Sequence, residues 1–569
     1  MNKYDNRVCN NGETKIGAET GTEKGVAAKA FAAMLALLLA LVLTLSSCGS
    51  SAAGSGTDDE AIGTVSAETT STASSNAASK SEMFTERDLA DDYNESEAET
   101  ITLSGTSAET SAKSGVSIDG STITISAEGV YVVSGTLSDG KIAVDADENA
   151  KVQIVLKDAD ITSKTSAAIY VKSADKVFIT TASETENSLA NGGSFTADGD
   201  TNIDGAVFAK DDITFNGSGS LAIESPAGHG VVGKDDVKFG GGTYTITAAK
   251  HGVQANDSIR MAESDVTITA GADKDGVHVS DDDAETSESF FYMADGTLSI
   301  DSQDDGIHAD AEVIIEGGEI NITESYEGIE GLSIKISGGS TSLVATDDGL
   351  NAAGGNNSTS DSTFSEDDWM GGHGGGFNDG GTNGSIEISG GKLHVIAGGD
   401  GLDSNGSLEI SGGYTEVVGP SSGDTSVIDF NGSGVITGGT FIGTGGAGMA
   451  ESFTSAEQGL IAVSVGNQSG AVSLKDAEGN VIAEAEPELD YAVVYISTED
   501  MAKGETYTLT AGSYSGEITL EDYMYSELAG GMGGGMGGHG GGMKGGMSGH
   551  GNEMQGGMSD VMQSEGIAS

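Results

Sequence analysis

Residues 296–353 read GTLSIDSQDDGIHADAEVIIEG, then GEINITESYEGIEGLSIKISG, then GSTSLVATDDGLNAA. The three segments are versions of one pattern, in which an opening glycine precedes an inner glycine by ten residues: Gly296 and Gly306, Gly318 and Gly328, Gly339 and Gly349. The same interval recurs between residues 242 and 252 and between residues 391 and 401. A repeat of about 22 residues without helix formers predicts a parallel β-solenoid, in which each repeat is one coil.

Within each repeat, apolar residues alternate with polar ones in three short runs. In the first segment quoted, the apolar residues of these runs are Leu298 and Ile300, then Ile307, then Val313 and Ile315. Alternation with a period of two predicts strands that bury one face. We therefore predict an all-β parallel β-helix with three strands in each coil. Its apolar side chains stack inside the helix at the usual strand spacing of about 4.8 Å.

Each inner glycine has an acidic residue before it and a polar residue two positions after it. The residues before the glycine are Asp275, Asp305, Glu327, Asp348 and Asp400. The residues two positions after it are His278, His308, Glu330, Asn351 and Asp403, and further carboxylates beside the first row come from Asp304 and Asp347. If the coils stack in register, both rows lie along one edge of the helix.

Such an edge needs counter-ions, because carboxylates about 4.8 Å apart repel by roughly 3–4 kcal/mol at an effective dielectric near 20. Hard divalent cations with oxygen ligands, above all Ca²⁺, suit it. We therefore predict Ca²⁺ ligands at Asp275, Asp304, Asp305, Glu327, Glu330, Asp347, Asp348, Asp400 and Asp403. We expect the non-acidic row members to contact a substrate: His278, His308 and Asn351. The alternative is a solvated turn, since Asp and Gly both favour turns.

Charge and aromatic content narrow the possible partners. The chain of 569 residues has 25 Lys and Arg against 89 Asp and Glu, a formal net charge of −64. This charge argues against a nucleic-acid partner, which needs a basic surface. The only tryptophan, Trp369, lies in a Gly-rich insertion at residues 354–383. An exposed tryptophan there can stack on a sugar ring or fold back over an apolar patch, and we include it among the candidate substrate contacts.

Residues 30–45, AFAAMLALLLALVLTL, form an apolar run that ends in LSSCGS, with Cys48 after small residues. The run is short for a membrane span and typical of a signal-peptide core. It resembles a bacterial lipoprotein signal. We therefore predict a signal peptide at residues 1–48, lipidation of Cys48, and a location on the extracellular face of the cytoplasmic membrane. A plain membrane anchor is the alternative, and it leaves the domain on the same side.

Composition divides the rest of the chain into four parts. Residues 49–83, rich in Ser, Thr and Ala, predict a flexible linker. The repeats predict a β-helix over residues 84–455, and less regular alternation predicts a small β domain over 456–528 that caps its open end. The Gly/Met/His repeats of residues 529–569 predict a disordered tail. We expect a monomer.

Several stretches of the chain together resemble a known family. They are FTERDLADDY (84–93), KVQIVLKDADITSKTSAAIYVKSADKVFIT (151–180), DGDTNIDGAVFAKDDITFNG (198–217), the DDGIHA and DDGLNAA turns, and the Gly/Met tail. They resemble the clostridial cell-surface family of carbohydrate-binding parallel β-helix proteins. The resemblance implies a right-handed β-helix similar to calcium-dependent pectate lyases, bound Ca²⁺, and binding of cellulose or polygalacturonate-type polysaccharides.

We expect a surface-tethered protein, not an enzyme, that binds plant cell-wall polysaccharide through Ca²⁺ on its acidic edge. Ca²⁺ bridges the carboxylates of protein and polymer, whereas a neutral glucan needs aromatic faces that are scarce here, so uronate polymers are favoured over cellulose. One alternative is a Ca²⁺-dependent pectate-type lyase, which needs a base beside the metal. Lys210, Lys234 and Lys274 lie near acidic turns, and the other explanation of each is a surface ion pair. The other alternative is a structural or adhesive rod.

Overall fold

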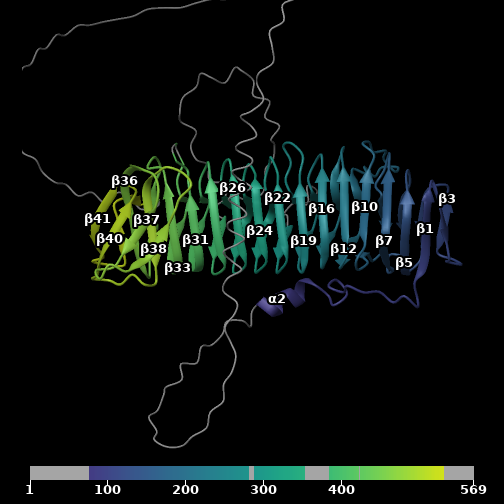
Figure 1. Ribbon diagram of the computed structural model, residues 1–569, viewed down its shortest axis with the longest axis horizontal. Helices are drawn as coiled ribbons and strands as arrows, with labels where there is room; N and C mark the ends of the chain where they lie inside the picture. Colours follow the sequence, from purple (N-terminus) through teal and green to yellow (C-terminus); the bar gives the residue numbers. More distant parts are fainter. Residues whose placement is uncertain (1–75, 281–287, 353–383, 422, 424, 531–569) are drawn as a thin grey trace, which may run out of the picture. The chain divides into compact units, whose positions relative to one another are not determined.

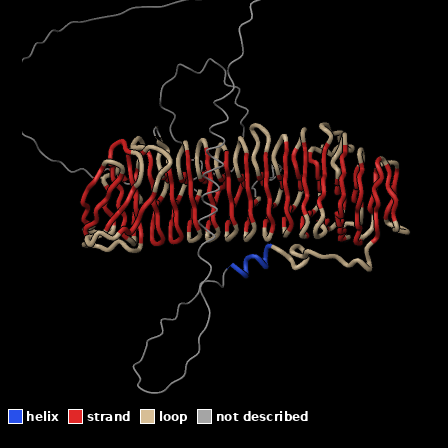
Figure 2. Tube along the Cα trace, viewed as in Figure 1, coloured by secondary structure: helices blue, strands red, loops and turns tan. Residues whose placement is uncertain are grey.

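The computed structural model describes residues 76–280, 288–352, 384–421, 423 and 425–530. Over these residues the fold is all-β apart from one short helix, α2 (Asn76–Met83). Most strands belong to one 37-stranded sheet. Figure 1 shows the strands side by side in chain order, and Figure 2 shows the turns between them gathered at the strand ends. The predicted all-β class is confirmed, and the sheet is mostly parallel, as in a β-helix.

Parallel strands form ladders, in which a strand pairs with its equivalent one coil further on. The first ladder runs through β1 (Glu99–Gly105), β5 (Gly129–Leu137), β7 (Lys151–Ser163), β10 (Glu186–Asn191), β13 (Ser220–Ser225), β16 (Gly242–Ala248), β19 (Ser264–Thr269), β22 (Thr297–Asp301), β24 (Glu319–Glu324), β26 (Ser340–Ala345), β29 (Lys392–Ala397), β31 (Ser407–Val418) and β33 (Ser433–Gly445). Leu298 pairs with Ile320 and Ile320 with Thr341, so the steps of 22 and 21 residues in the sequence are coil lengths.

A second ladder, which carries the polar rows, begins after the first strand of each coil. It runs through β4 (Thr122–Ile125), β6 (Lys141–Asp145), β8 (Ile169–Ser173), β11 (Gly205–Ala209), β14 (His229–Gly233), β17 (Val253–Ala255), β20 (Val277–Val279), β23 (Ile307–Ile315), β25 (Ile329–Ile336), β27 (Leu350–Ala352), β30 (Leu402–Ser404) and β32 (Ile428–Phe430). Its short strands place successive turns directly beside one another.

A third ladder runs from β7 through β9 (Lys176–Thr181), β12 (Asp212–Gly217), β15 (Asp236–Phe239), β18 (Ser258–Met261) and β21 (Phe290–Met293), then through β23, β25, β28 (Ser385–Ile388), β31 and β33. Because β23 and β25 extend through the second and third ladders as continuous strands, their coils contain two strands where the sequence predicts three. The ladder continues across residues 281–287 and 353–383, since Ile259 pairs with Phe291 and Ile334 with Ile386.

The apolar residues of the alternating runs are buried inside the β-helix, as the sequence predicts. Leu298, Ile300, Ile307, Val313 and Ile315 are at most 1% exposed. Each such side chain contributes about 1.5–3 kcal/mol of transfer free energy when fully buried. Because equivalent residues pair in register, aliphatic side chains stack on aliphatic side chains along one continuous core.

The two glycines of a repeat are required for different reasons. Gly296 has a φ of +90°, a conformation that side chains with a Cβ disfavour. At Gly306 the backbone is ordinary, but a Cβ there would lie 2.6 Å from the carbonyl oxygen of Gly328 and 2.6 Å from Ile322 Cδ1. The opening glycine therefore serves the bend, whereas the inner glycine lets the next coil approach closely.

The N-terminal part of the described chain runs alongside the coils (Figure 1), and its polar contacts are with strands of the third ladder. Asp88, in the FTERDLADDY stretch, is 0% exposed, and its Oδ1 lies 2.7 Å from Lys176 Nζ. The Thr214 hydroxyl donates to Asp88 Oδ1 at 3.0 Å, and the backbone N–H of Thr85 donates to Oδ2 at 2.9 Å. Helix α2 falls within the predicted linker 49–83, and its Lys80 pairs with Glu263 at 2.7 Å.

The final strands leave the parallel pattern. β39 (Tyr491–Thr498) pairs antiparallel with both β33 and β36 (Gly459–Gln468). A separate four-stranded sheet contains β38 (Val481–Ala485), β37 (Val472–Lys475), β40 (Thr506–Ala511) and β41 (Tyr514–Thr519). The remaining strands are β2 (Ser107–Thr110), β3 (Val116–Asp119), β34 (Glu451–Ser452), β35 (Ser455–Ala456), β42 (Met524–Ser526) and β43 (Ala529–Gly530).

Some sequence predictions concern residues outside the described ranges. These are the signal peptide at 1–48 with Cys48, the insertion that contains Trp369, and the tail beyond residue 530. The lipidation, the sugar contact of Trp369 and the nature of the tail stay predictions. Among the residues that the structure describes, no helix has both the length and the apolar character that a membrane crossing requires.

Candidate functional site

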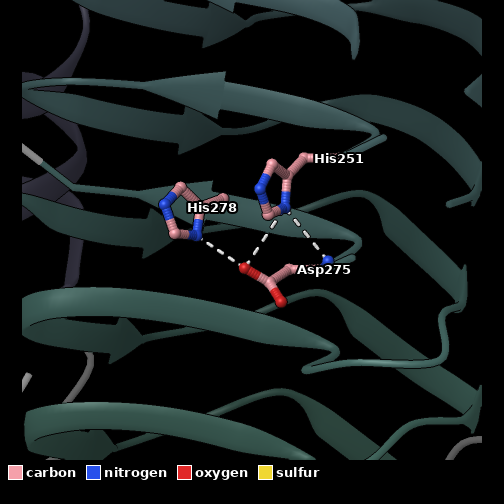
Figure 3. Close-up of side chains that lie close together, drawn as sticks. All are labelled: His251, Asp275 and His278. Carbon is pink, nitrogen blue, oxygen red and sulfur yellow. Dashed lines mark hydrogen bonds and ion pairs between the residues drawn. The ribbon is translucent and has the colours of Figure 1, made fainter. Parts of the chain in front are cut away.

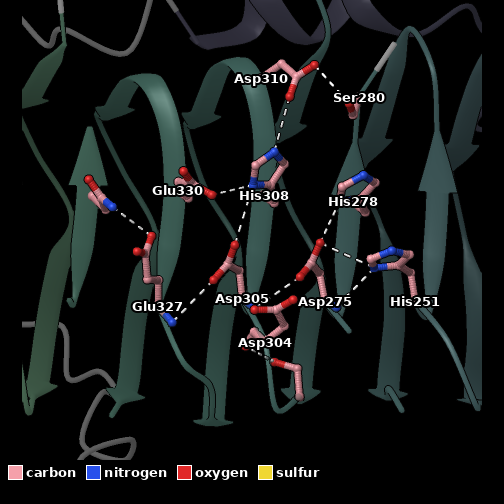
Figure 4. Close-up of polar contacts among 12 residues, drawn as sticks. His251, Asp275, His278, Ser280, Asp304, Asp305, His308, Asp310, Glu327 and Glu330 are labelled. Atoms are coloured by element: carbon pink, nitrogen blue, oxygen red, sulfur yellow. Dashed lines mark hydrogen bonds and ion pairs between the residues drawn. The ribbon is translucent and has the colours of Figure 1, made fainter. Parts of the chain in front are cut away.

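The second ladder brings the two polar rows together on one edge. Its register pairs His278 with His308, His308 with Glu330, Glu330 with Asn351, and Asn351 with Asp403. The residues before the inner glycines lie beside this row, as Figure 4 shows for Asp275, Asp305 and Glu327. The coils therefore stack in register here, and we call the two rows together the polar edge.

Carboxylates before the inner glycines accept the backbone N–H of the equivalent residue one coil further on. Asp275 Oδ1 accepts the N–H of Asp305 at 3.1 Å, and Asp305 Oδ1 accepts the N–H of Glu327 at 3.4 Å. Asp348 Oδ1 accepts the N–H of Asp400 at 2.6 Å. These bonds satisfy a backbone donor at the turn and leave the second carboxylate oxygen free for other contacts. These carboxylates can therefore stabilise the turn through one oxygen and still bind a metal ion through the other.

The first part of the polar edge is a stack of histidine rings. The ring centroids of His229 and His251 are 5.1 Å apart, those of His251 and His278 are 4.3 Å apart, and those of His278 and His308 are 5.0 Å apart. His229 and His251 were not among the residues predicted from the sequence. A signal for them existed, because each stands directly before an inner glycine, where later coils have Asp or Glu.

His251, Asp275 and His278 form a compact group (Figure 3). Asp275 Oδ2 lies 2.5 Å from His278 Nδ1 and 3.3 Å from His251 Nδ1. Burial lowers the pKa of His251 to about 4, so its imidazole is neutral at neutral pH. Burial also opposes ionisation of Asp275, but the contact with the His278 imidazole outweighs it, and the pKa of the carboxyl is held below its ordinary value.

The next coils hold a second group, Asp305, His308 and Glu330, all buried (Figure 4). His308 Nδ1 lies 2.5 Å from Glu330 Oε2 and 3.5 Å from Asp305 Oδ2, and His308 Nε2 lies 3.2 Å from Asp310 Oδ1. Burial raises the pKa of Asp305 to about 8. Burial alone lowers the pKa of His308, but the three carboxylates raise it well above its ordinary value. Both ring nitrogens of His308, a predicted substrate contact, thus face carboxylates.

The last part of the polar edge consists of carboxylates. Oxygens of Asp348, Asp400 and Asp403 lie within 4.8 Å of one another. Burial, followed by the charge of neighbouring carboxylates, raises the pKa of Asp348 to about 6 and those of Asp400 and Asp403 to about 7. Asn351 Oδ1 is buried and has no hydrogen-bond partner among the described residues, although its Nδ2 donates to Glu327 Oε2 at 2.9 Å. We call these four residues the oxygen site.

The oxygen site fits a hard cation. Three carboxylates and an amide oxygen without a partner are the ligand types that Ca²⁺ prefers. A further carboxylate group, Asp275, Asp304 and Asp305, also has oxygens within 4.8 Å of one another. The histidine-bearing groups do not match Ca²⁺ in the same way, because imidazole nitrogen suits borderline transition metals. The sequence analysis assigned Ca²⁺ to all the carboxylates of the polar edge and substrate contact to its histidines, whereas the structure contains two kinds of donor set there: carboxylates with imidazoles, and carboxylates with other oxygens.

Other candidates lie around these groups. The side chain of Asp347 lies beside Tyr326, and it raises the pKa of that phenol to about 12. Asp403 pairs in register with Asp429, which extends the row after the glycines by one coil. Asp429 was missed in the sequence because Val427 stands where the inner glycine is expected. Glu451 lies near it, and its pKa is raised to about 7 by burial and then by the charge of Asp429.

The three lysines considered as bases differ in position. Lys210 and Lys234 are exposed, whereas Lys274 is half-buried and directly precedes Asp275. Its charge acts on Asp304, where it opposes the rise in pKa that burial and Asp275 cause. Of the three lysines, Lys274 is therefore the one beside a carboxylate group of the polar edge.

Part of the chain is similar in sequence to known carbohydrate-binding domains. Residues 119–365 match the family model described as carbohydrate-binding domain-containing protein. A carbohydrate-binding domain-containing protein of Acetivibrio thermocellus is 34% identical over 136 residues, which are 24% of this chain and 48% of that protein. The chain thus spans about half the length of the curated relative that it matches.

A solved structure described as the polysaccharide lyase-like protein from C. thermocellum, gadolinium derivative, is 28% identical. The match covers 41% of this chain and 91% of that one, with a TM-score of 0.38. The family match at residues 119–365 includes the histidine groups and much of the second ladder. This part of the chain is therefore similar to a carbohydrate-binding domain family.

Proposed function

We propose that this protein is a cell-surface lipoprotein with a right-handed β-helix that binds acidic plant cell-wall polysaccharide of the polygalacturonate type through Ca²⁺ on its polar edge. The observation that carries the proposal is the oxygen site. Oxygens of Asp348, Asp400 and Asp403 lie within 4.8 Å of one another. Asn351, which pairs in register with Asp403, has a buried Oδ1 without a partner in the described part of the chain. The similarity of residues 119–365 to carbohydrate-binding domains supports a sugar polymer as the partner.

The protein residues have separate tasks in this proposal. The backbone N–H of Asp400 holds Asp348 Oδ1 at 2.6 Å and so fixes the orientation of that carboxylate. The bond from Asn351 Nδ2 to Glu327 fixes which way the Asn351 amide oxygen faces. Bound Ca²⁺ would supply the positive charge that lets uronate carboxylates approach a chain with a formal net charge of −64. Neighbouring coils repeat about every 4.8 Å, so an extended polymer can lie across several of them.

The proposal is tested by retention on immobilised polygalacturonate with Ca²⁺ and with a chelator. We expect retention in Ca²⁺ and its loss in chelator, because the protein and polymer carboxylates then repel each other. Cellulose serves as the neutral comparison and should retain less protein. Equal retention with and without chelator contradicts the bridging by metal, and no retention on any glycan favours the structural rod.

An exposed aromatic residue stands beside the oxygen site. Tyr326 is 47% exposed, directly precedes Glu327, and lies beside Asp347. We expect Tyr326→Ala to raise the Kd for polygalacturonate about threefold to tenfold, because an aromatic contact contributes about 0.5–1.5 kcal/mol beyond its area. Titration by calorimetry measures this change. Tyr523→Ala is the matched control, since Tyr523 is 43% exposed but outside the polar edge; equal effects of both substitutions contradict a specific contact.

The raised pKa values of the oxygen site predict a pH dependence. Folding raises the pKa from 3.8 to about 6 for Asp348 and to about 7 for Asp400 and Asp403. Between about pH 4 and pH 7 the unfolded chain binds fewer protons than the folded chain, so the stability contributed by these groups falls as pH rises. Asparagine mimics the protonated acid and removes this dependence.

Thermal unfolding of the wild type and of D348N/D400N/D403N tests this dependence. In chelator the two should unfold at similar temperatures at about pH 3, where the acids are protonated in both the folded and the unfolded chain, and the variant should unfold at the higher temperature at about pH 8. In Ca²⁺ at about pH 8 the gap should narrow, because a ligand at about 100 times its Kd stabilises the folded wild type by about 2.7 kcal/mol and the variant lacks the ligands. A gap that is the same in chelator and in Ca²⁺ contradicts metal binding at this site.

A lyase is the second candidate, and the position of Lys274 is the observation that favours it. Lys274 is half-buried beside the carboxylate group Asp275, Asp304 and Asp305. A lysine beside a bound cation can accept the proton next to a uronate carboxylate. Absorbance from an unsaturated uronate product, present in the wild type and absent in Lys274→Gln, would establish this activity. We propose binding without turnover, so we expect no such product.

A further inference from the structure

The histidine stack is a second donor set that the proposed Ca²⁺ binding does not use. The rings of His251 and His278 stack with centroids 4.3 Å apart, and both face the same carboxylate oxygen of Asp275 (Figure 3). One ligand atom from each of the three residues lies within 4.8 Å of the other two. Asp275 is 3% exposed and His251 is 8% exposed. The donors are therefore held inside the edge rather than spread over a solvated surface.

The distances suit a small metal ion. Ligand atoms about 2.0–2.1 Å from a tetrahedral metal are separated by about 3.3 Å. The distance from His251 Nδ1 to Asp275 Oδ2 is 3.3 Å, which is this value. His278 Nδ1 lies 2.5 Å from the same oxygen, and a movement of less than about 1 Å gives it the same spacing. His278 is the half-buried member of the group, so it has room to make that movement.

The hydrogen bonds leave two acceptors facing each other. The backbone N–H of Asp275 donates to His251 Nδ1 at 3.0 Å, so Nδ1 carries a lone pair and the proton of the neutral ring is on Nε2. That nitrogen and Asp275 Oδ2 are both acceptors, and they repel at 3.3 Å unless a cation lies between them. Coordination replaces the backbone hydrogen bond at Nδ1 and removes the repulsion.

The surrounding residues provide further donors and orientation. His229 stacks on His251, and its Nδ1 is buried without a hydrogen-bond partner in the described ranges, while its Nε2 lies 3.5 Å from Asp204. Asp275 Oδ1 accepts the N–H of Asp305 at 3.1 Å, which directs Oδ2 toward the two imidazoles. Fixing a ligand by hydrogen bonds from outside the first coordination layer is a regular feature of metal sites.

We propose that His251, Asp275 and His278 bind a divalent transition metal of the Zn²⁺ class, with His229, whose ring stacks on His251, as an additional imidazole beside the group. Imidazole nitrogens with one carboxylate form a donor set for such metals, whereas Ca²⁺ takes oxygen ligands. The polar edge then holds two different metals: a nitrogen-bound ion at the histidine stack and an oxygen-bound ion at Asp348, Asp400 and Asp403.

The test uses the full chain, freed of metal and titrated with Co²⁺ in excess Ca²⁺. We expect visible absorption bands of a four- or five-coordinate Co²⁺ site, which Zn²⁺ abolishes and Ca²⁺ leaves unchanged. H251Q/H278Q should weaken Co²⁺ binding by at least about 100-fold, since loss of an outer partner alone costs 10–100-fold. D403N, which changes only the oxygen site, and H539Q/H550Q, which removes the histidines of the C-terminal tail, should keep the bands.

A second measurement needs no variant and so does not depend on how the variants fold. Histidines of the wild type are modified with diethyl pyrocarbonate, with and without Zn²⁺, and the modified peptides are identified by mass spectrometry. We expect Zn²⁺ to protect His278 and His251. Protection confined to His373, His539 or His550, displacement of Co²⁺ by Ca²⁺, or loss of the Co²⁺ bands in H539Q/H550Q overturns the proposal.

Discussion

The variant D348N/D400N/D403N should lose Ca²⁺-dependent binding to polygalacturonate. The substitutions preserve side-chain shape but remove every carboxylate of the oxygen site, leaving Asn351 as the one proposed ligand that is unchanged. Loss of one outer-shell partner costs 10–100-fold in metal affinity, so we expect loss of three ligands to weaken Ca²⁺ binding by more than about 100-fold. Calorimetry with Ca²⁺ and retention on polygalacturonate measure the two effects on the same protein.

The matched control is D265N/D301N/E319Q, which makes the same change in net charge. These three residues are exposed on the first ladder, outside the polar edge. We expect the control to bind Ca²⁺ and polymer as the wild type does. If both variants lose retention equally, the loss results from the change in net charge. If D348N/D400N/D403N retains full binding, the oxygen site does not hold the metal.

Asp88→Ala should cost about 3–5 kcal/mol of stability, because it removes the nearer counter-charge of the buried Lys176 and leaves the more distant Asp212, whose Oδ2 lies 3.9 Å away. Asp88 is 0% exposed, and its Oδ1 lies 2.7 Å from Lys176 Nζ, which is itself 9% exposed in its side chain. The substitution also removes the acceptor for the Thr214 hydroxyl and for the Thr85 N–H. Chemical denaturation measures the loss, and hydrogen exchange of residues 84–93 shows whether this segment detaches first.

The double variant D88A/K176M tests the physical reason. Methionine keeps much of the length of the lysine stem but removes the charge, so stability should recover in part relative to Asp88→Ala alone. The stabilities of the two single variants and the double variant give the coupling energy. A loss within about 0.5 kcal/mol for Asp88→Ala, the range of an ordinary surface substitution, contradicts the role of the buried pair.

The coil lengths and the interior were predictable from the sequence because both are local in origin. Leu298 and Ile300 alternate with polar neighbours, which identifies the buried face within one repeat. The glycines stand at the same place in each repeat, so their spacing gives the coil length. Stacking in register then follows, since a slip by one residue moves apolar side chains to the outside. The number of strands in each coil was less predictable: Ile307–Ile315 forms one strand because its backbone pairs with neighbours on both sides of the bend.

The sequence predicted that the residues of the candidate site lie in a row along one edge, but it did not predict which side chains contact one another. Asp275, Asp305 and Asp400 occupy the same place in the repeat and share the hydrogen bond to the next coil. They nevertheless have different neighbours: two imidazoles at Asp275, one at Asp305, and carboxylates at Asp400. Asp275 contacts a second imidazole because residue 251, in the preceding coil, is His where later coils have Asp or Glu. That histidine forms a group with Asp275 only because His278 lies one coil further on.

By itself, the sequence determined an all-β chain with coils of about 22 residues, an aliphatic interior, and a polar edge formed by the residues around the inner glycines. Only the tertiary structure decided which atoms on that edge face one another. The physical reason is that hydrogen bonding, burial and the resulting pKa values arise between coils, from residues such as His251 and Asp275 or Asp348 and Asp400, which are 24 and 52 residues apart. No single repeat contains both partners of such a contact.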